Sequence, residues 1–205
     1  MAKRNENDNE NENQNERTTD DRDILAAHEQ KLAGQHELLR SLMRELFQSE
    51  RSAMKHPRRQ ADRLGGGPPA QALQAVSEHA ARSYGDLCAI ASAGDLASRR
   101  GGMVIGSLLS TARHVVLDRA VDAERSYRAT LLGLRHGVDV VKLVRKVADA
   151  SGRVELAGFC TRWLGEREPL VERVEAAMGW FAEHPQRAAE MARARRRRRR
   201  HPAPA

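Results

Sequence analysis

The chain has 205 residues, of which 40% are hydrophobic, 31% are charged and only 3% are aromatic. This length suits one domain of ordinary size with tails, and the scarcity of aromatic and β-branched clusters argues against strands. An apolar set rich in alanine, leucine and valine instead predicts an all-α protein. The longest apolar stretch, residues 103–109, is far shorter than the roughly 18 residues that a membrane-spanning helix needs, so no transmembrane segment is expected.

The formal net charge of +7 is distributed unevenly along the chain. Residues 1–22 carry four basic and seven acidic side chains, a net charge of −3, whereas arginines near the C-terminus contribute +7. The remainder, residues 23–192, has 24 basic and 21 acidic side chains and is nearly balanced. A domain that binds nucleic acid across its body carries its basic excess there, so this distribution argues against such a footprint.

Residues 1–19 are predicted to form a disordered acidic tail. Asparagine alternates there with acidic or amide residues, and no apolar residue lies between Ala2 and Ile24. Such a segment cannot offset the entropy that ordering would cost. No apolar segment follows Met1, so no signal peptide is expected and a cytoplasmic location is the default prediction.

A leucine-rich amphipathic helix is predicted over residues 20–56, starting at the N-cap residues around Asp20. Leucines recur every seven residues, but only one of the four intervening half-heptad positions is apolar. A coiled coil normally has both positions apolar over three or four heptads. Two alternatives follow: the helix docks on its own bundle, or it self-associates or binds a partner helix. The residues predicted for the second alternative are Leu25, Leu32, Leu39, Leu42 and Leu46.

Pro57 is predicted to end this helix, and residues 57–69 read as a linker that contains three consecutive glycines. A bundle domain is predicted over residues 70–184, because apolar residues keep helical spacing through most of it. Gly137 is expected to separate two of its helices, and Pro169 to kink the last helix or to begin a new one. The expected architecture is an antiparallel bundle of four or more helices, with a separate N-terminal helix and disordered termini.

The few bulky residues of the bundle domain are spaced as core residues rather than as a cofactor site; they are Tyr84, Tyr127, Phe159, Trp163, Trp180 and Phe181. Cys88 and Cys160 each lie on an apolar helical stripe and are predicted to be buried free thiols.

In layout, residues 70–184 resemble the ferritin-like family. That family binds two metal ions through glutamates and Glu-x-x-His motifs on four helices, so the resemblance implies a metal- or redox-handling bundle. However, no glutamate of this chain is followed three positions later by histidine. Weaker pairs remain, such as His114 with Asp118 and His136 with Asp139, but exposed helix faces commonly carry such pairs. A phosphate-binding loop and a nucleophile paired with a base are also missing. The chain is therefore predicted to be no enzyme and to hold no metal or cofactor.

Residues 185–205 form an arginine-rich basic tail that can contact polyanions, with binding that falls steeply as salt rises. The tail contains no aromatic residue to stack on bases, so this contact is expected to be non-specific. The tail does not distinguish nucleic acid from an anionic membrane surface, and a solvated extension without a selected role is the alternative. The contact residues predicted are Arg193, Arg195, Arg196, Arg197, Arg198, Arg199 and Arg200.

Together these features predict a non-enzymatic interaction or scaffold protein. Its N-terminal helix would bind a protein partner or a second copy, and its basic tail would contact polyanions. The acidic N-terminal tail could compete for these arginines within one molecule. The alternatives are an intact or degenerate ferritin-like bundle that handles metal or redox chemistry, and a nucleoid-associated DNA-binding protein.

Overall fold

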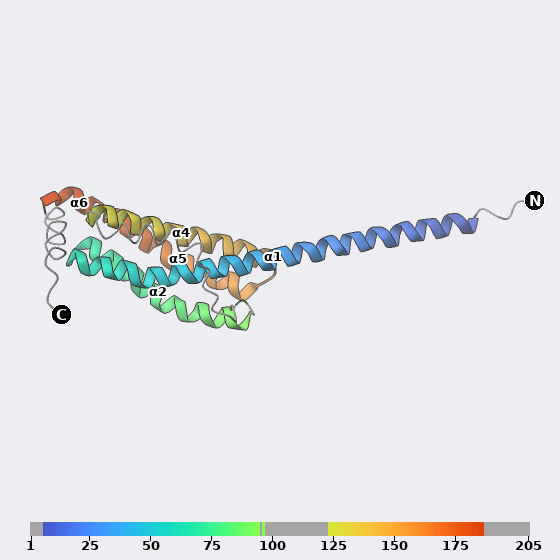
Figure 1. Ribbon diagram of the computed structural model, residues 1–205, viewed down its shortest axis with the longest axis horizontal. Coiled ribbons are helices and arrows are strands. Elements are labelled where there is room, and N and C mark those ends of the chain that lie inside the picture. Colours follow the sequence, from blue (N-terminus) through green and yellow to red (C-terminus); the bar gives the residue numbers. More distant parts are fainter. Residues whose placement is uncertain (1–5, 95, 97–122, 187–205) are drawn as a thin grey trace, which may run out of the picture.

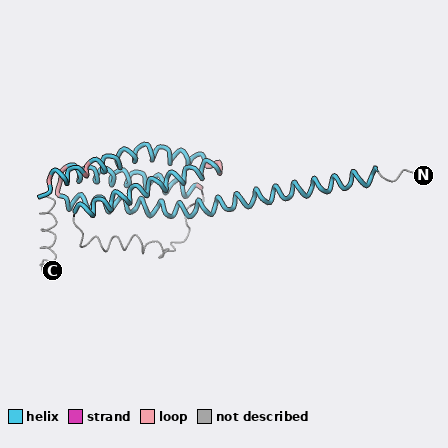
Figure 2. The backbone as a smooth tube through the Cα atoms, turned by 90° about the horizontal axis from the view of Figure 1, so that it is seen from above, coloured by secondary structure: helices cyan, strands magenta, loops and turns pink. Residues whose placement is uncertain are grey.

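The computed structural model describes residues 6–94, 96 and 123–186, and the side chains of these residues from Ala26 onward. All its regular elements are helices (Figures 1 and 2): α1 (Glu6–Leu64), α2 (Pro68–Ala93), α4 (Ala123–Ala150), α5 (Val154–Ala176) and the short α6 (Gly179–Glu183). The predicted all-α bundle is thereby confirmed. The sequence features predicted within residues 97–122 and 187–205 lie outside the described residues.

The four long helices form a ring in which each contacts two neighbours. Helix α1 packs against α2 and α4, and α5 packs against the same two helices. Neighbours in the ring run antiparallel (Figure 1). The bundle thus consists of two helical hairpins, α1–α2 and α4–α5, docked side by side. The bundle includes the C-terminal part of α1, so it begins before the predicted boundary at residue 70. For this part of α1, the structure agrees with the alternative in which the helix docks on its own bundle.

The predicted linker over residues 57–69 is reduced to three residues, because α1 continues through Pro57 to Leu64. A proline inside a helix costs about 3 kcal/mol, but Pro57 is itself buried, and the turn after it places Ala61 and Leu64 in the core. The hairpin turn is made by Gly65–Gly67, all with positive φ angles that other residues rarely adopt.

Helix α4 is continuous through Gly137, so the predicted break there is wrong. Gly137 instead marks a close approach of α4 to α1, because a Cβ atom at this position would lie 2.5 Å from Oγ of Ser49. Helix α5 likewise continues through Pro169 to Ala176, so no new helix begins at this proline.

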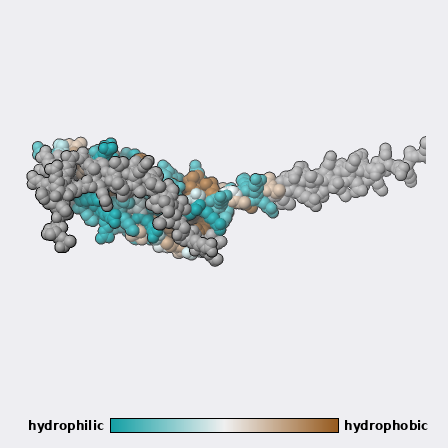
Figure 3. Space-filling view, in the orientation of Figure 1, coloured by the Kyte–Doolittle hydropathy of each residue, from teal (hydrophilic) through white to brown (hydrophobic). Residues whose placement is uncertain are grey.

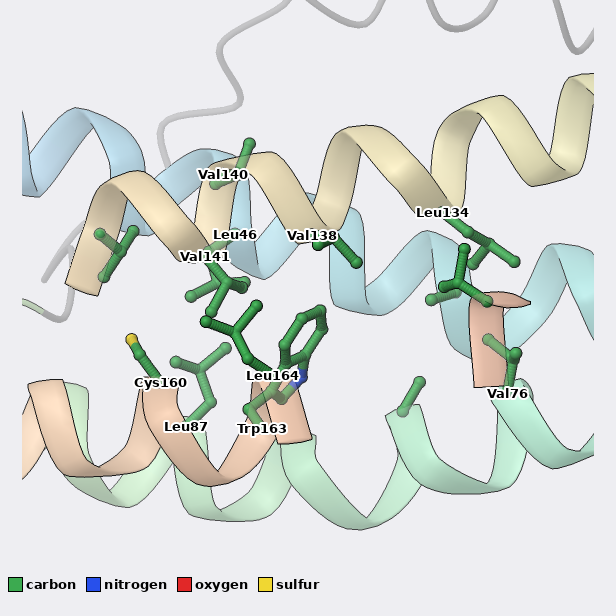
Figure 4. Packing of buried hydrophobic residues seen from close by; sticks show 14 of the residues in the cluster. Leu46, Val76, Leu87, Leu134, Val138, Val140, Val141, Cys160, Trp163 and Leu164 are labelled. Carbon is green, nitrogen blue, oxygen red and sulfur yellow. The ribbon is translucent and has the colours of Figure 1, made fainter. Parts of the chain in front are cut away.

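The core lies between the two hairpins and receives side chains from all four long helices. Figure 4 shows Leu46 of α1, Leu87 of α2 and Val141 of α4 meeting Trp163 and Leu164 of α5. Five of the six bulky residues predicted as core are buried. The sixth, Tyr84, is half-buried and packs edge-on against Phe47, with 5.9 Å between the ring centroids.

Helix α1 begins at Glu6, earlier than the predicted start near Asp20. Its residues 6–35, called here the arm, project from one end of the bundle, with no other described element beside most of their length (Figure 1). At 1.5 Å per residue the arm is about 45 Å long. The disorder expected for residues 1–19 rests on composition and stays a prediction. Of the helices in the described part of the chain, none combines the length and apolar character needed to cross a membrane.

Candidate functional site

The structure divides the five leucines predicted for partner binding into two groups. Leu39, Leu42 and Leu46 are 0%, 7% and 0% exposed because they pack inside the bundle, so they are not available to a partner. Leu32 lies on the arm and is 45% exposed, and Leu25 lies further out along the same arm. Among the described side chains of the predicted site, Leu32 therefore remains available for docking.

The end of the bundle from which the arm emerges is held by Arg153, in the turn between α4 and α5. Its guanidinium donates hydrogen bonds to the carbonyl oxygen of Gly94, at 3.1 Å, and to Nδ1 of His36 on α1, at 3.1 Å. Three helices are thus tied together where the arm leaves them. Apolar surface gathers near this end of the bundle (Figure 3), where Val154 and Leu38 are exposed. The hydrogen bonds of Arg153 to Gly94 and His36 therefore fix the direction in which the arm leaves the bundle.

A second surface feature is a row of exposed basic residues on the bundled part of α1, which we call the basic stripe. It consists of Arg40, Arg44, Arg51, Lys55 and Arg58. At 3.6 residues per turn these positions fall within an arc of about 60°. The two glutamates in this stretch point elsewhere: Glu45 pairs with His136 of α4 at 2.8 Å, and Glu50 is buried. Arg44, Arg51, Lys55 and Arg58 of the stripe therefore present positive charge to solvent along one side of α1.

Charge counting over residues 23–192 missed this stripe, because acidic residues elsewhere balance it. The recurrence of basic residues at i, i+4, i+11, i+15 and i+18 was the signal in the sequence that could have revealed it.

A cluster of polar side chains is buried between the hairpins, and we call it the buried polar cluster: Glu50, His79, Ser83 and Arg167, which are 1%, 2%, 7% and 1% exposed. Arg167 of α5 donates from Nη2 to Oε2 of Glu50 at 3.0 Å and from Nε to Nδ1 of His79 at 2.9 Å. Ser83 of α2 donates to the same Oε2 of Glu50 at 2.9 Å. The guanidinium also lies 4.5 Å from the centroid of the Trp163 ring. One arginine of the second hairpin thus bonds two polar groups of the first, and Ser83 supports one of them.

The electrostatics of the cluster keep His79 neutral. Burial, with the nearby charges of Arg167 and Arg82, lowers the pKa of His79 from 6.5 to about 4. Its Nδ1 accepts a hydrogen bond from Nε of Arg167, so the ring hydrogen of neutral His79 is on Nε2, which lies 3.2 Å from Oε2 of Glu166. Burial lowers the pKa of Arg167, and the charge of Glu50 and its hydrogen bond oppose this shift.

The cluster contains a serine, a histidine and a carboxylate, the residue types of a hydrolytic triad, but their connections differ from those of a triad. The Ser83 hydroxyl lies at hydrogen-bond distance from Glu50 and from the backbone carbonyl of His79 rather than from the imidazole of His79, and both nitrogens of that ring are engaged by Arg167 and Glu166. The carboxylate that accepts from Ser83 is itself paired with the buried guanidinium of Arg167, so Ser83 lacks the serine–histidine pairing that activates the nucleophile of a triad. The arrangement is that of an ion pair that joins the hairpins. Sequence reasoning missed it because its members lie on three helices far apart in the chain.

The two cysteines are free thiols, as predicted, although only Cys160 is buried and Cys88 is half-buried. Burial raises the pKa of Cys160 to about 12, which makes it a poor nucleophile. Among the described side chains, no three His, Cys, Asp or Glu residues come together as a metal site would need. The pair His114 and Asp118 and the arginines of the basic tail lie outside the described residues.

No protein-family model matches the chain, and neither a curated protein nor a solved structure shows significant similarity to it.

Proposed function

We propose that this chain is a non-enzymatic interaction or scaffold protein that docks a partner, or a second copy of itself, through the arm of α1. The observation that carries the proposal is the projection of the arm from the bundle with Leu32 exposed on it. A single helix without a partner is marginal in water and is normally stabilised by covering an apolar face.

The bundle supports this role by holding the base of the arm. Leu39, Met43 and Leu46 anchor α1 in the core directly after the arm, and the bond from Arg153 to His36 fixes the point of emergence. The arm is therefore presented to a partner in a defined direction, which reduces the orientational entropy lost on docking.

Photo-cross-linking tests the proposal in the full chain. A photoreactive amino acid replaces Glu29 on the arm or, as a matched control, Glu172 on α5; both glutamates are exposed. In the cells that make the protein, position 29 is expected to give protein adducts in higher yield than position 172. Equal yields at the two positions would contradict the proposal.

Polyanion contact through the basic tail forms the second part of the proposal, and it rests on the arginines at 193 and 195–200. Affinity for a DNA duplex and for anionic vesicles is measured against salt for the full chain and for a variant with residues 195–200 changed to serine. The native chain is expected to bind more tightly and to show the steeper salt dependence. Identical affinities for the two chains would remove this part of the proposal.

A further inference from the structure

The charge pattern of α1 points to a specific partner for the arm. We propose that two copies of the chain dimerise through antiparallel α1 helices, so that the arm of each copy lies along the basic stripe of the other. This inference rests on the proposed role of the arm, names the partner as a second copy of the chain, and assigns the contact to the charged face of the arm rather than to the face that carries Leu32.

Charge is segregated along α1. Residues 6–23 of the arm contain eight acidic and two basic side chains, a net charge of −6, and the basic stripe follows from Arg40 to Arg58. Parallel pairing of two such helices would set acidic beside acidic and basic beside basic. Antiparallel pairing sets acidic beside basic twice, once at each end of the contact, and the two-fold symmetry closes the assembly at two copies.

The spacing of the charges also matches in the antiparallel sense. Asp8, Glu12 and Asp23 are separated by four and eleven residues, and Arg40, Arg51 and Lys55 by eleven and four. A register that sets Asp23 opposite Arg40 therefore also sets Glu12 opposite Arg51 and Asp8 opposite Lys55. At 3.6 residues per turn the three acidic positions fall within an arc of about 60° on the same face of α1 as the stripe.

The lengths of the two parts of α1 agree with this register. The arm is about 45 Å long, and the bundled part, residues 36–64, is about 43 Å long at the same rise per residue. The register is centred between Lys31 and Leu32, so residues 6–27 of each arm lie opposite residues 36–57 of the other copy, about three quarters of the bundled part of α1. Near this centre the shared face carries Ala26 and Ala33, whose small side chains allow the two helices to approach closely.

Charge reversal tests the dimer in the full chain after nuclease treatment. The stripe variant carries Arg40→Glu, Arg51→Glu and Lys55→Glu, and the arm variant carries Asp8→Lys, Glu12→Lys and Asp23→Lys. Light scattering at low salt should give the native chain twice the 22.8 kDa mass of one copy and each variant the mass of one copy. A mixture of the two variants should restore the double mass, because each arm then meets a stripe of opposite sign. Unchanged thermal unfolding of each variant confirms that its bundle is intact.

Two controls define the contact. Leu32→Asp changes a position about 80° or more from the stripe residues around α1, so it should leave the dimer intact. With Cys88→Ala as background, a chain carrying Asp23→Cys and Arg40→Cys should form linked dimers with a short bifunctional maleimide, whereas Asp23→Cys alone should not.

In light scattering, the inference is overturned by a native chain with the mass of one copy at every concentration, or by a larger mass that disappears with nuclease. Among the variants, it is overturned by a dimer that survives stripe reversal or that is lost only through Leu32→Asp. In cross-linking, linked dimers from Asp23→Cys alone also overturn it. If the native chain has the mass of one copy while position 29 still cross-links to another protein, the dimer fails but the proposed docking function stands. If the cross-links are also lost, both fail.

Discussion

Replacing Arg167 with methionine should destabilise the bundle by about 3–5 kcal/mol, the usual cost of breaking a buried ion pair by removing one partner. Arg167 is 1% exposed and donates to Glu50, which is also 1% exposed. Without the guanidinium, the carboxylate keeps only the hydrogen bond from Ser83, and Nδ1 of His79 loses its donor. A buried charge that is neither neutralised nor fully hydrogen-bonded is the origin of the loss.

A second change, at Glu50, should reverse most of this loss of stability. In the chain with both Arg167→Met and Glu50→Leu, no charge of this pair is left in the core, and apolar side chains of similar volume fill the space. Such replacements are often neutral or stabilising, so the double variant should be within about 1 kcal/mol of the native chain. The Glu50→Leu change alone should be costly, because it leaves Arg167 buried without its carboxylate.

Urea unfolding followed by circular dichroism and by tryptophan fluorescence measures all four chains and gives the coupling between the two positions. A loss below about 1 kcal/mol for Arg167→Met would refute the ion-pair reasoning. A double variant as unstable as the sum of the two single variants would refute it as well.

Four further predictions concern single features of the structure. The pKa of His79 is about 4 in the fold against 6.5 when exposed, so its neutral state favours folding fully above pH 6.5. About 3 kcal/mol is lost as the pH falls to about 4, and urea unfolding against pH should show a shallower fall for His79→Gln. Gly137→Ala should stabilise α4 more when Ser49 is also alanine than in the native chain, because Oγ of Ser49 then no longer crowds the new Cβ; a double-mutant cycle in urea measures the difference, and equal effects contradict the contact. A thiol reagent should modify Cys88 in the folded chain and Cys160 only after unfolding; mass spectrometry of the labelled peptides decides this, and rapid labelling of Cys160 speaks against its burial. In the dilute monomer, hydrogen exchange should be fast over residues 6–34 and slow from Leu39 onward, since only the latter part of α1 packs on the bundle; strong protection throughout contradicts this division.

The helical class followed from the sequence because the apolar stripes on α2, α4 and α5 are nearly unbroken. The ends of the helices were harder to predict. Pro57 and Gly137 have the local chemistry of helix ends, yet both lie inside helices, since packing of Leu64 and the close approach of Ser49 outweigh local preference. Such tertiary contacts have no signature in the local sequence.

The candidate sites were predictable to different degrees. The leucines that recur every seven residues identified α1 as an amphipathic helix. The same pattern could not show where along α1 the bundle begins to cover it, and so could not predict that Leu32 is exposed while Leu39 is buried. Glu50 lies four residues after Leu46, and Arg167 four after Trp163, so both charges occupy core positions of their helices. A charge at such a position signals a buried partner, although its identity needs the three-dimensional arrangement.

The division of the buried polar cluster between the hairpins has a consequence for the order of folding. Glu50, His79 and Ser83 all belong to the α1–α2 hairpin, and their contacts within it are local in sequence, whereas Arg167 arrives with α4–α5. Because contacts within a hairpin are more local in sequence than contacts between hairpins, we expect each hairpin to form before the two dock, and Arg167 to leave water at the docking step. A hairpin docked one turn out of place would bury this cation without its anion, which is strongly unfavourable. We therefore expect the ion pair to disfavour misaligned docking of the two hairpins during folding.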